Sequence, residues 1–258
     1  MAVPAEEPVE LLVDGRMVAV IHCTPLNLDE LAVGYLLSQE LIPEQTDVLC
    51  VRAEQGNRRV SVTLRHPPEN DVAGSRAGTE AMTAKNQDPK PLVIYSGCAQ
   101  RAYLAGRRGH MGDTIFGPAM VRAVLSRVLR KGELYRQTRG VHSAAIADAN
   151  GEIMALREDI GRHNALDKIL GFTAARGLDP GKLFIAATGR ISADAVAKLI
   201  RFGIPLMLSR GVPTSLALSM AGETGISLVG SMGPAKLRVY SHPERLGIER
   251  GRDEPILI

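Results

Sequence analysis

The chain has 258 residues, which is enough for one large hydrophobic core or two smaller ones, and its 45% hydrophobic and 23% charged content is typical of a globular protein. The net charge of +3 is too small to indicate a polyanionic partner by itself. Aromatic residues make up only 3% and there is no tryptophan, which argues against a stacking platform for single-stranded nucleic acid, so no nucleic-acid partner is expected.

Three features predict a cytoplasmic protein with no membrane contact. No apolar run approaches the ~18 residues of a membrane-spanning helix. The first ten residues are acidic and lack the basic and apolar regions of a signal peptide. Three cysteines, an odd number in a chain of this length, do not make a disulfide framework.

Residues 1–66 are predicted to form a small α+β domain. Its expected elements are strands over 9–13 and 17–21, a helix over 28–40, and a second hairpin over 48–53 and 59–65. Asp14-Gly15 between the first two strands is a tight-turn pair. Asn27 and Glu30 resemble a capping pair at the start of the helix.

Residues 67–91 differ in composition, being rich in Pro, Asn, Asp, Gly, Ala and Lys with little periodicity, and we interpret them as a flexible surface linker. The second part, 92–258, is expected to begin with a strand over 92–95. A helix is predicted from Pro118 to Lys131, because proline suits the first turn and Gly132 follows the end. A hairpin over 143–147 and 151–156 is expected across Asn150-Gly151.

From residue 183 onward, strand and helix patterns alternate. The expected strands cover 183–187, 204–208, 226–229 and 237–240, and the helices between them end at Gly203 and at about Gly222. This alternation predicts an α/β domain with a mostly parallel sheet. In such sheets ligands bind beyond the carboxyl ends of the strands.

The segment 157–168 is the most informative stretch of the chain. An apolar run, 153–156, leads into two carboxylates, two arginines and a histidine within seven residues, and a helical pattern follows at once. A binding site at the edge of a sheet requires polar groups held in this way. A structural role is equally open, because Asp159 is a residue type that caps helices, and His163, Leu166 and Leu170 fall on one helix face.

Four loops at the expected sheet edge each combine small residues with one cation, respectively Arg162, Arg190, Arg210 and Lys236. Ser192 and Thr214 stand where helices begin, and helix starts attract anions. Ordinary turn chemistry accounts for a single loop of this kind. Four on one edge favour a ligand that carries several phosphates, although the P-loop pattern is absent.

Cys98 is the candidate nucleophile. It lies in a Ser-Gly-Cys turn after the strand over 92–95, and Arg101 supplies a cation one turn later, which favours the thiolate. The alternative is an ordinary buried cysteine. Cys23 and Cys50 lie in strand-like apolar stretches and are interpreted as small core residues.

No metal site is predicted. The sequence contains neither Cys-x-x-Cys nor His-x-x-x-His, and the zinc-deaminase signature is missing. His142 precedes a predicted strand and either faces the same sheet edge or simply ends that strand.

In combination and in order, four segments of the chain resemble the FdhD/NarQ family of formate dehydrogenase accessory sulfurtransferases. They are residues 157–168, 140–145 (Gly-Val-His-Ser-Ala-Ala), 213–217 (Pro-Thr-Ser-Leu-Ala) and 239–245 (Val-Tyr-Ser-His-Pro-Glu-Arg). The resemblance implies a cytidine-deaminase-like three-layer α/β domain beside a smaller N-terminal α+β domain. It also implies a cytoplasmic homodimer.

The activity that the resemblance implies is sulfur relay. A cysteine desulfurase would give persulfide sulfur to Cys98, which would pass it to the molybdenum cofactor in its bis-guanine-dinucleotide form, before that cofactor enters formate dehydrogenase. The implied cofactor-binding residues are Ser231, Met232, Gly233, Pro234, Ala235 and Lys236 of one loop, and we add Arg162, His163, Arg190 and Arg210 from the other loops.

The chain departs from the family pattern at one position. Many members have Cys-x-x-Cys where this chain has Cys98-Ala99-Gln100-Arg101, so an internal disulfide is impossible here. Persulfide carriage needs only one sulfur nucleophile, and Arg101 is suited to stabilise its anion.

Two alternatives remain open from the sequence. A non-catalytic chaperone would hold and deliver the molybdenum cofactor, with Cys98 incidental. A hydrolase on the deaminase-like fold is the other, and the missing zinc ligands argue against it.

Overall fold

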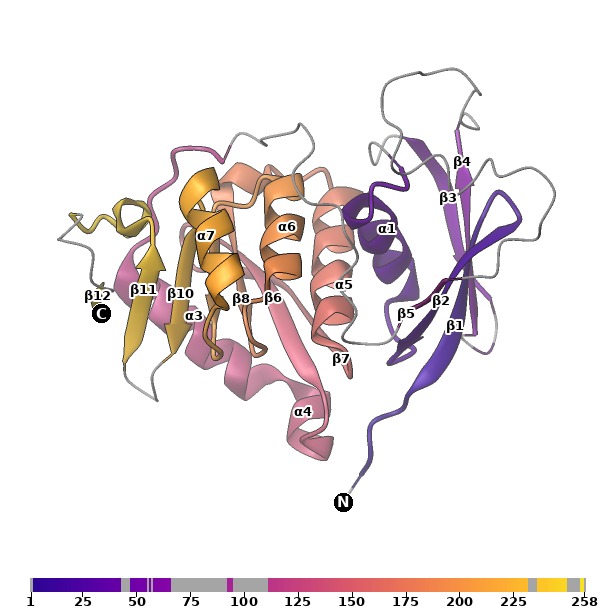
Figure 1. Ribbon diagram of the computed structural model, residues 1–258. Helices are drawn as coiled ribbons and strands as arrows, with labels where there is room; N and C mark the ends of the chain where they lie inside the picture. Colours follow the sequence, from indigo (N-terminus) through magenta and orange to yellow (C-terminus); the bar gives the residue numbers. More distant parts are fainter. Residues whose placement is uncertain are drawn as a thin grey trace.

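The computed structural model describes residues 2–42, 47–54, 56, 58–65, 92–94, 111–231, 236–249 and 256–257, with only the backbone for 92–94 and 256. These residues form two β-sheets, and helix α1 (Leu28–Ser38) lies between the first sheet and helix α5 (Arg162–Ala175) of the second unit (Figure 1). None of the described helices is both long enough and apolar enough to span a membrane.

The first sheet has the strand order β3-β4-β1-β2-β5. The strands are β1 (Glu7–Val13), β2 (Arg16–Cys23), β3 (Val48–Ala53), β4 (Arg59–Leu64) and β5 (Leu92–Ile94). Asp14 and Gly15 both have positive φ, 47° and 78°, as the tight turn between β1 and β2 requires, so this predicted hairpin is confirmed. The predicted capping pair is wrong, because Asn27 adopts a left-handed conformation and its side chain caps nothing.

The strand that was expected to begin the second part belongs instead to the first sheet. β5 pairs in parallel with β2, with Val93 opposite Val20. The pattern of residues 92–95 correctly indicated a strand but carried no information about its partner. The linker predicted over 67–91 lies outside the described residues.

The second sheet has the strand order β12-β11-β10-β9-β8-β6-β7. The strands are β6 (His142–Asp148), β7 (Ile153–Asp159), β8 (Leu183–Ala187), β9 (Leu206–Ser209), β10 (Ser227–Ser231), β11 (Leu237–Ser241) and β12 (Ile256–Leu257). Among the described strands of this sheet, only β8, β9 and β10 run parallel to one another, and the other neighbouring pairs are antiparallel. The prediction of a mostly parallel sheet is therefore wrong, because hairpins extend the parallel centre on both sides.

Helices cover both faces of this sheet (Figure 1). α3 (Pro118–Lys131) packs on one face and is followed by the short α4 (Glu133–Thr138), whereas α5, α6 (Ala193–Phe202) and α7 (Ser215–Thr224) pack on the other. Short 3-10 turns at Pro180–Lys182 and Pro243–Leu246 lie in the connections between these elements. The three-layer arrangement is as expected, and the specific likeness to cytidine deaminases stays a prediction.

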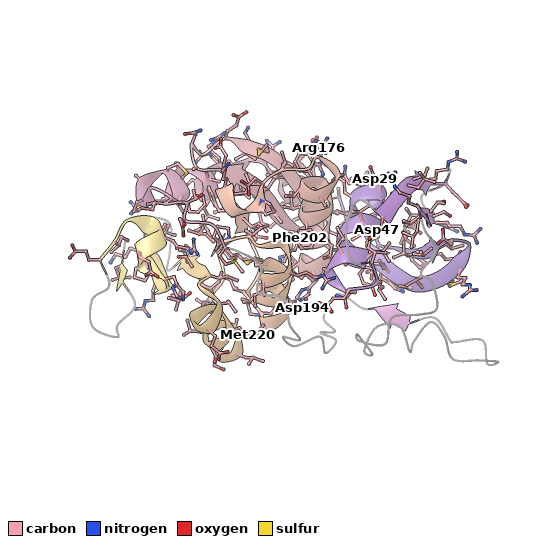
Figure 2. The ribbon with its side chains drawn as sticks, turned by 90° about the horizontal axis from the view of Figure 1, so that it is seen from above. Asp29, Asp47, Arg176, Asp194, Phe202 and Met220 are labelled. Carbon is pink, nitrogen blue, oxygen red and sulfur yellow. The ribbon has the colours of Figure 1, made fainter. Side chains whose placement is uncertain are left out.

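The two units meet where α1 crosses α5 at a pair of glycines. A Cβ atom on Gly34 would lie 1.9 Å from the carbonyl oxygen of Asp167, and one on Gly171 would lie 1.9 Å from that of Glu30. Only glycine permits this backbone contact. Phe202 of α6 packs against both cores and lies at the boundary between the units (Figure 2).

Candidate functional site

An open cleft of about 600 Å³ lies at one edge of the second sheet. It is lined by Tyr135, Arg139, Gly140, Val141, His142, Arg162, Thr188, Gly189, Arg190, Arg210 and Gly211. These residues stand at the amino end of β6, after the carboxyl ends of β7, β8 and β9, and on α4. The cleft therefore lies at the edge of the second sheet that was predicted to bind a ligand.

The cleft is strongly cationic. Arg139, Arg162, Arg190 and Arg210 line it, and among the described residues no Asp or Glu does so. Burial and, next, the positive charge of Arg190 lower the pKa of Arg162. The Nε atom of Arg162 is buried and has no hydrogen-bond partner among the described residues. An anion in the cleft would offset the repulsion between these guanidinium groups.

The loops after β8 and β9 are fixed against each other by backbone contacts. The amide of Ile191 donates to the carbonyl of Val212 at 3.1 Å, and that of Thr214 donates to the carbonyl of Ile191 at 3.0 Å. Gly211 packs so closely that a Cβ atom there would lie 2.5 Å from the carbonyl oxygen of Gly189. Arg190 and Arg210 therefore extend from a rigid support.

Two histidines lie beside these arginines. His163 Nδ1 is 2.7 Å from Asp194 Oδ2, and both side chains are mostly buried. Burial by itself would raise the pKa of Asp194, but the close contact with His163 and the charges of Lys198, His163 and Arg162 lower it below its usual range. Burial, and then the charges of Arg162 and His163, lower the pKa of His142 below its ordinary value of 6.5.

The hydroxyl groups of Ser192 and Thr214, at two of the predicted helix starts, form hydrogen bonds within their own helices. Ser192 Oγ accepts from the amide of Ala195 at 3.4 Å, and Thr214 Oγ1 accepts from that of Ala217 at 3.3 Å. Both residues stand at helix starts as predicted, where their side chains act as N-terminal caps.

Most of the charged segment 157–168 is structural. Asp159 and Lys168 form a fully buried pair at 2.7 Å, and the Asp159 carboxylate also accepts from the amide of Thr24 at 3.1 Å. Arg157 binds both carboxylate oxygens of Glu30 on α1, at 2.5 and 2.7 Å. These contacts join the two units. Asp159 does not cap α5, whose cap residue is Gly161 without a side-chain bond.

Arg162, Arg190 and Arg210 come together in the cleft, as predicted. His163 lines a small adjoining hollow with Arg162 and Arg190. Ser231 and Lys236 are described, and neither lines the cleft. Residues 232–235, Cys98 and Arg101 lie outside the described residues.

Tyr135 and Arg139 of the cleft were not predicted. α4 is too short for its pattern to stand out, and the only signal was its position directly before the Gly-Val-His segment at 140–142. The Arg139 guanidinium carbon lies 5.2 Å from the centre of the Tyr135 ring, and Arg210 Nη1 donates to the Tyr135 hydroxyl at 3.4 Å.

The other two cysteines differ from each other. Cys23 is buried as expected, and burial raises its thiol pKa to about 12, so it is unreactive. Cys50 is only half-buried, so its interpretation as a core residue is wrong. Within the described part of the chain, no three His, Cys, Asp or Glu side chains converge as metal ligands would.

The family model described as "FdhD/NarQ family" matches residues 4–247. A protein named sulfur carrier protein FdhD from Xanthomonas euvesicatoria is 32% identical, with 98% of this chain and 88% of the relative aligned. One of the same name from Shouchella clausii is 28% identical, with 95% and 89% aligned. A crystal structure of a provisionally named formate dehydrogenase accessory protein from Desulfotalea psychrophila superposes with a TM-score of 0.73 at 25% identity, covering 95% of this chain and 90% of that one. The chain therefore belongs to the FdhD/NarQ family.

Proposed function

We propose that this protein is a cytoplasmic sulfur carrier for the maturation of formate dehydrogenase. It accepts sulfur from a cysteine desulfurase on Cys98 and transfers it to the molybdenum cofactor in its bis-guanine-dinucleotide form, which is its substrate. The names of the relatives support the sulfur-carrying role and the link to formate dehydrogenase. Action as a homodimer is part of the proposal.

The four-arginine cleft is the observation that carries this proposal. Guanidinium groups bind phosphate oxygens in pairs, and a bis-guanine-dinucleotide cofactor carries two diphosphate groups. Arg162, Arg190 and Arg210 come from three different strand–helix connections, so together they suit an extended anion rather than a single small ion.

The sulfur-loading step needs one thiolate. Cys98 Sγ attacks the terminal sulfur of the desulfurase persulfide, a new S–S bond forms, the old one breaks, and the desulfurase thiolate leaves with the bonding electron pair. No outside oxidant or reductant is needed for this exchange. Arg101 would stabilise the resulting anionic persulfide.

Pyrophosphate is a direct probe of the cleft. Isothermal titration calorimetry should show that Arg162→Ala weakens pyrophosphate binding by roughly tenfold to a hundredfold, the effect of one charged hydrogen-bonding group. Arg52→Ala, which removes an exposed arginine from β3 of the first sheet, is the matched control and should bind like the wild type. Equal affinities in all three proteins would refute a phosphate site in the cleft.

Sulfur transfer is tested separately. After incubation with a cysteine desulfurase and cysteine, mass spectrometry should find an added sulfur atom on Cys98 and none at that position in Cys98→Ala. A folded wild-type protein without the adduct would count against the proposal. If Cys98→Ala fully supports formate dehydrogenase maturation, the protein is instead a cofactor chaperone.

A further inference from the structure

α4 forms one wall of the cleft, yet it has only six residues, Glu133–Thr138. A helix of this length is not stable by itself in water. Its cap residue, Gly132, has no side chain to receive the first free amide groups. Its placement therefore depends on contacts from elsewhere in the chain.

Glu158 of β7 provides those contacts. Its Oε2 accepts from the amide of Leu134 at 2.9 Å, and its Oε1 accepts from the amide of Tyr135 at 3.0 Å and from Ser143 Oγ at 3.3 Å. The carboxylate lies so close to the turn before α4 that a Cβ atom on Gly132 would be 2.7 Å from Oε1. The Glu158 side chain thus holds the first turn of α4 and packs against Gly132 just before it.

The strand end that carries Glu158 is itself firmly held. Its carbonyl oxygen accepts from Lys168 Nζ at 3.2 Å, and the next residue, Asp159, forms the buried pair with that lysine. Neighbouring residues on a strand point to opposite faces, so β7 binds α5 and α1 on one face and α4 on the other. Glu158 therefore anchors α4 to a strand that is fixed by the core.

α4 in turn places two groups at the cleft. Tyr135 accepts a hydrogen bond from Arg210, and Arg139, directly after the helix, supplies the fourth guanidinium. The backbone of Arg139 is left-handed, with φ of 57°, and its amide donates to the carbonyl of Tyr135 at 2.8 Å. Displacing α4 would move Arg139 and release Arg210.

We propose that Glu158 is a positioning residue for anion binding: without touching the ligand, it holds α4 so that Arg139 and Arg210 face the cleft. This inference rests on the proposed function, since the ligand is the phosphate portion of the cofactor. Glu158 is not among the cleft's lining residues.

The proposal makes a prediction with a distinctive sign. Removing a negative charge near a cationic cleft should by itself strengthen anion binding. Displacement of α4, and with it of Arg139 and Arg210, should weaken anion binding. We expect Glu158→Ala to weaken pyrophosphate binding by about tenfold, the effect of one guanidinium contact. Glu158→Gln keeps one carbonyl acceptor and should fall between Glu158→Ala and the wild type.

The matched control is Glu152→Ala. Glu152 is exposed in the turn at the opposite end of the β6–β7 hairpin, so its replacement makes the same change in net charge without touching α4. The deciding comparison is a double-mutant cycle with Arg139→Ala, in which Glu158→Ala should have a much smaller effect on affinity than in the wild-type background.

Hydrogen exchange of the unliganded protein tests the first step independently. The amides of Leu134 and Tyr135 should exchange faster in Glu158→Ala than in Glu152→Ala. Unchanged exchange, or pyrophosphate affinity equal to or tighter than that of Glu152→Ala, would overturn the inference. The inference would also be overturned if Glu158→Ala weakened pyrophosphate binding as much in the Arg139→Ala background as in the wild type. Wild-type protein that binds no pyrophosphate would refute the proposed function, and exchange would still decide whether Glu158 fixes α4.

Discussion

The glycine contact between α1 and α5 should make the protein highly sensitive to a single added methyl group. In Gly34→Ala the new Cβ atom would lie 1.9 Å from the carbonyl oxygen of Asp167, and the next nearest atoms are also backbone. Backbone cannot rotate away as a side chain can. The helices must therefore separate by more than 1 Å, since carbon and oxygen atoms in contact lie about 3.5 Å apart.

The loss of unfolding free energy caused by separating α1 from α5 can be estimated. Overpacking of a tight core typically costs about 1–3 kcal/mol, and the rigid neighbours here place this site at the upper end. The Gly171 contact and the hydrogen bond from Ser38 to Asp167 (3.0 Å) span the same crossing and would also be strained. Alanine recovers about 1 kcal/mol through its better helix propensity. The net loss is then about 2 kcal/mol, or roughly 4–8 °C in melting temperature for a chain of this size.

Gly222→Ala is the matched control, because it makes the same substitution inside a helix. A Cβ atom on Gly222 of α7 meets nothing within 4 Å, so only the propensity gain remains. Urea denaturation followed by circular dichroism should show Gly34→Ala less stable and Gly222→Ala slightly more stable than the wild type. A Gly34→Ala protein as stable as the wild type would refute the close backbone contact.

Two further outcomes follow from buried charges. Lys198 and Asp167 form a buried ion pair at 2.6 Å. Lys198→Met should lower the unfolding free energy by about 3–5 kcal/mol, because it leaves the buried Asp167 carboxylate without its charged partner. Adding Asp167→Leu should recover most of that loss in the same denaturation assay. Because the pKa of His142 is lowered in the folded state, the unfolded chain binds a proton more readily below the ordinary value of 6.5. The unfolding free energy should therefore fall as the pH decreases from about 7 to about 5, and His142→Asn should reduce this slope, whereas an unchanged slope would contradict the assignment.

Local features of the fold were accessible from the sequence because short-range chemistry determines them. Pro118 and Gly132 bound α3 as predicted, and Gly151 has the positive φ that its turn requires. Which strands pair was not accessible, because the pattern within a strand does not identify its neighbour. β5 joined the first sheet for that reason, and β6 is antiparallel to β8.

The charged segment 157–168 shows the same limit at the candidate site. Its density of charge suggested a binding site, with a structural role left open, and the sequence did not reveal that Arg157, Asp159 and Lys168 make structural contacts. Arg157 and Asp159 lie on one face of β7 and meet the N-terminal unit, whereas Arg162 and His163 follow the strand and reach the cleft region. Only the partners, Glu30 and Thr24, distinguish the two groups, and both are more than a hundred residues away in the sequence.

α5 connects the cleft mechanically to the other half of the molecule. The helix begins at Arg162, inside the cleft, and at Gly171 its backbone touches that of α1. One continuous helix therefore carries both an arginine of the cleft and the backbone contact that joins the two units.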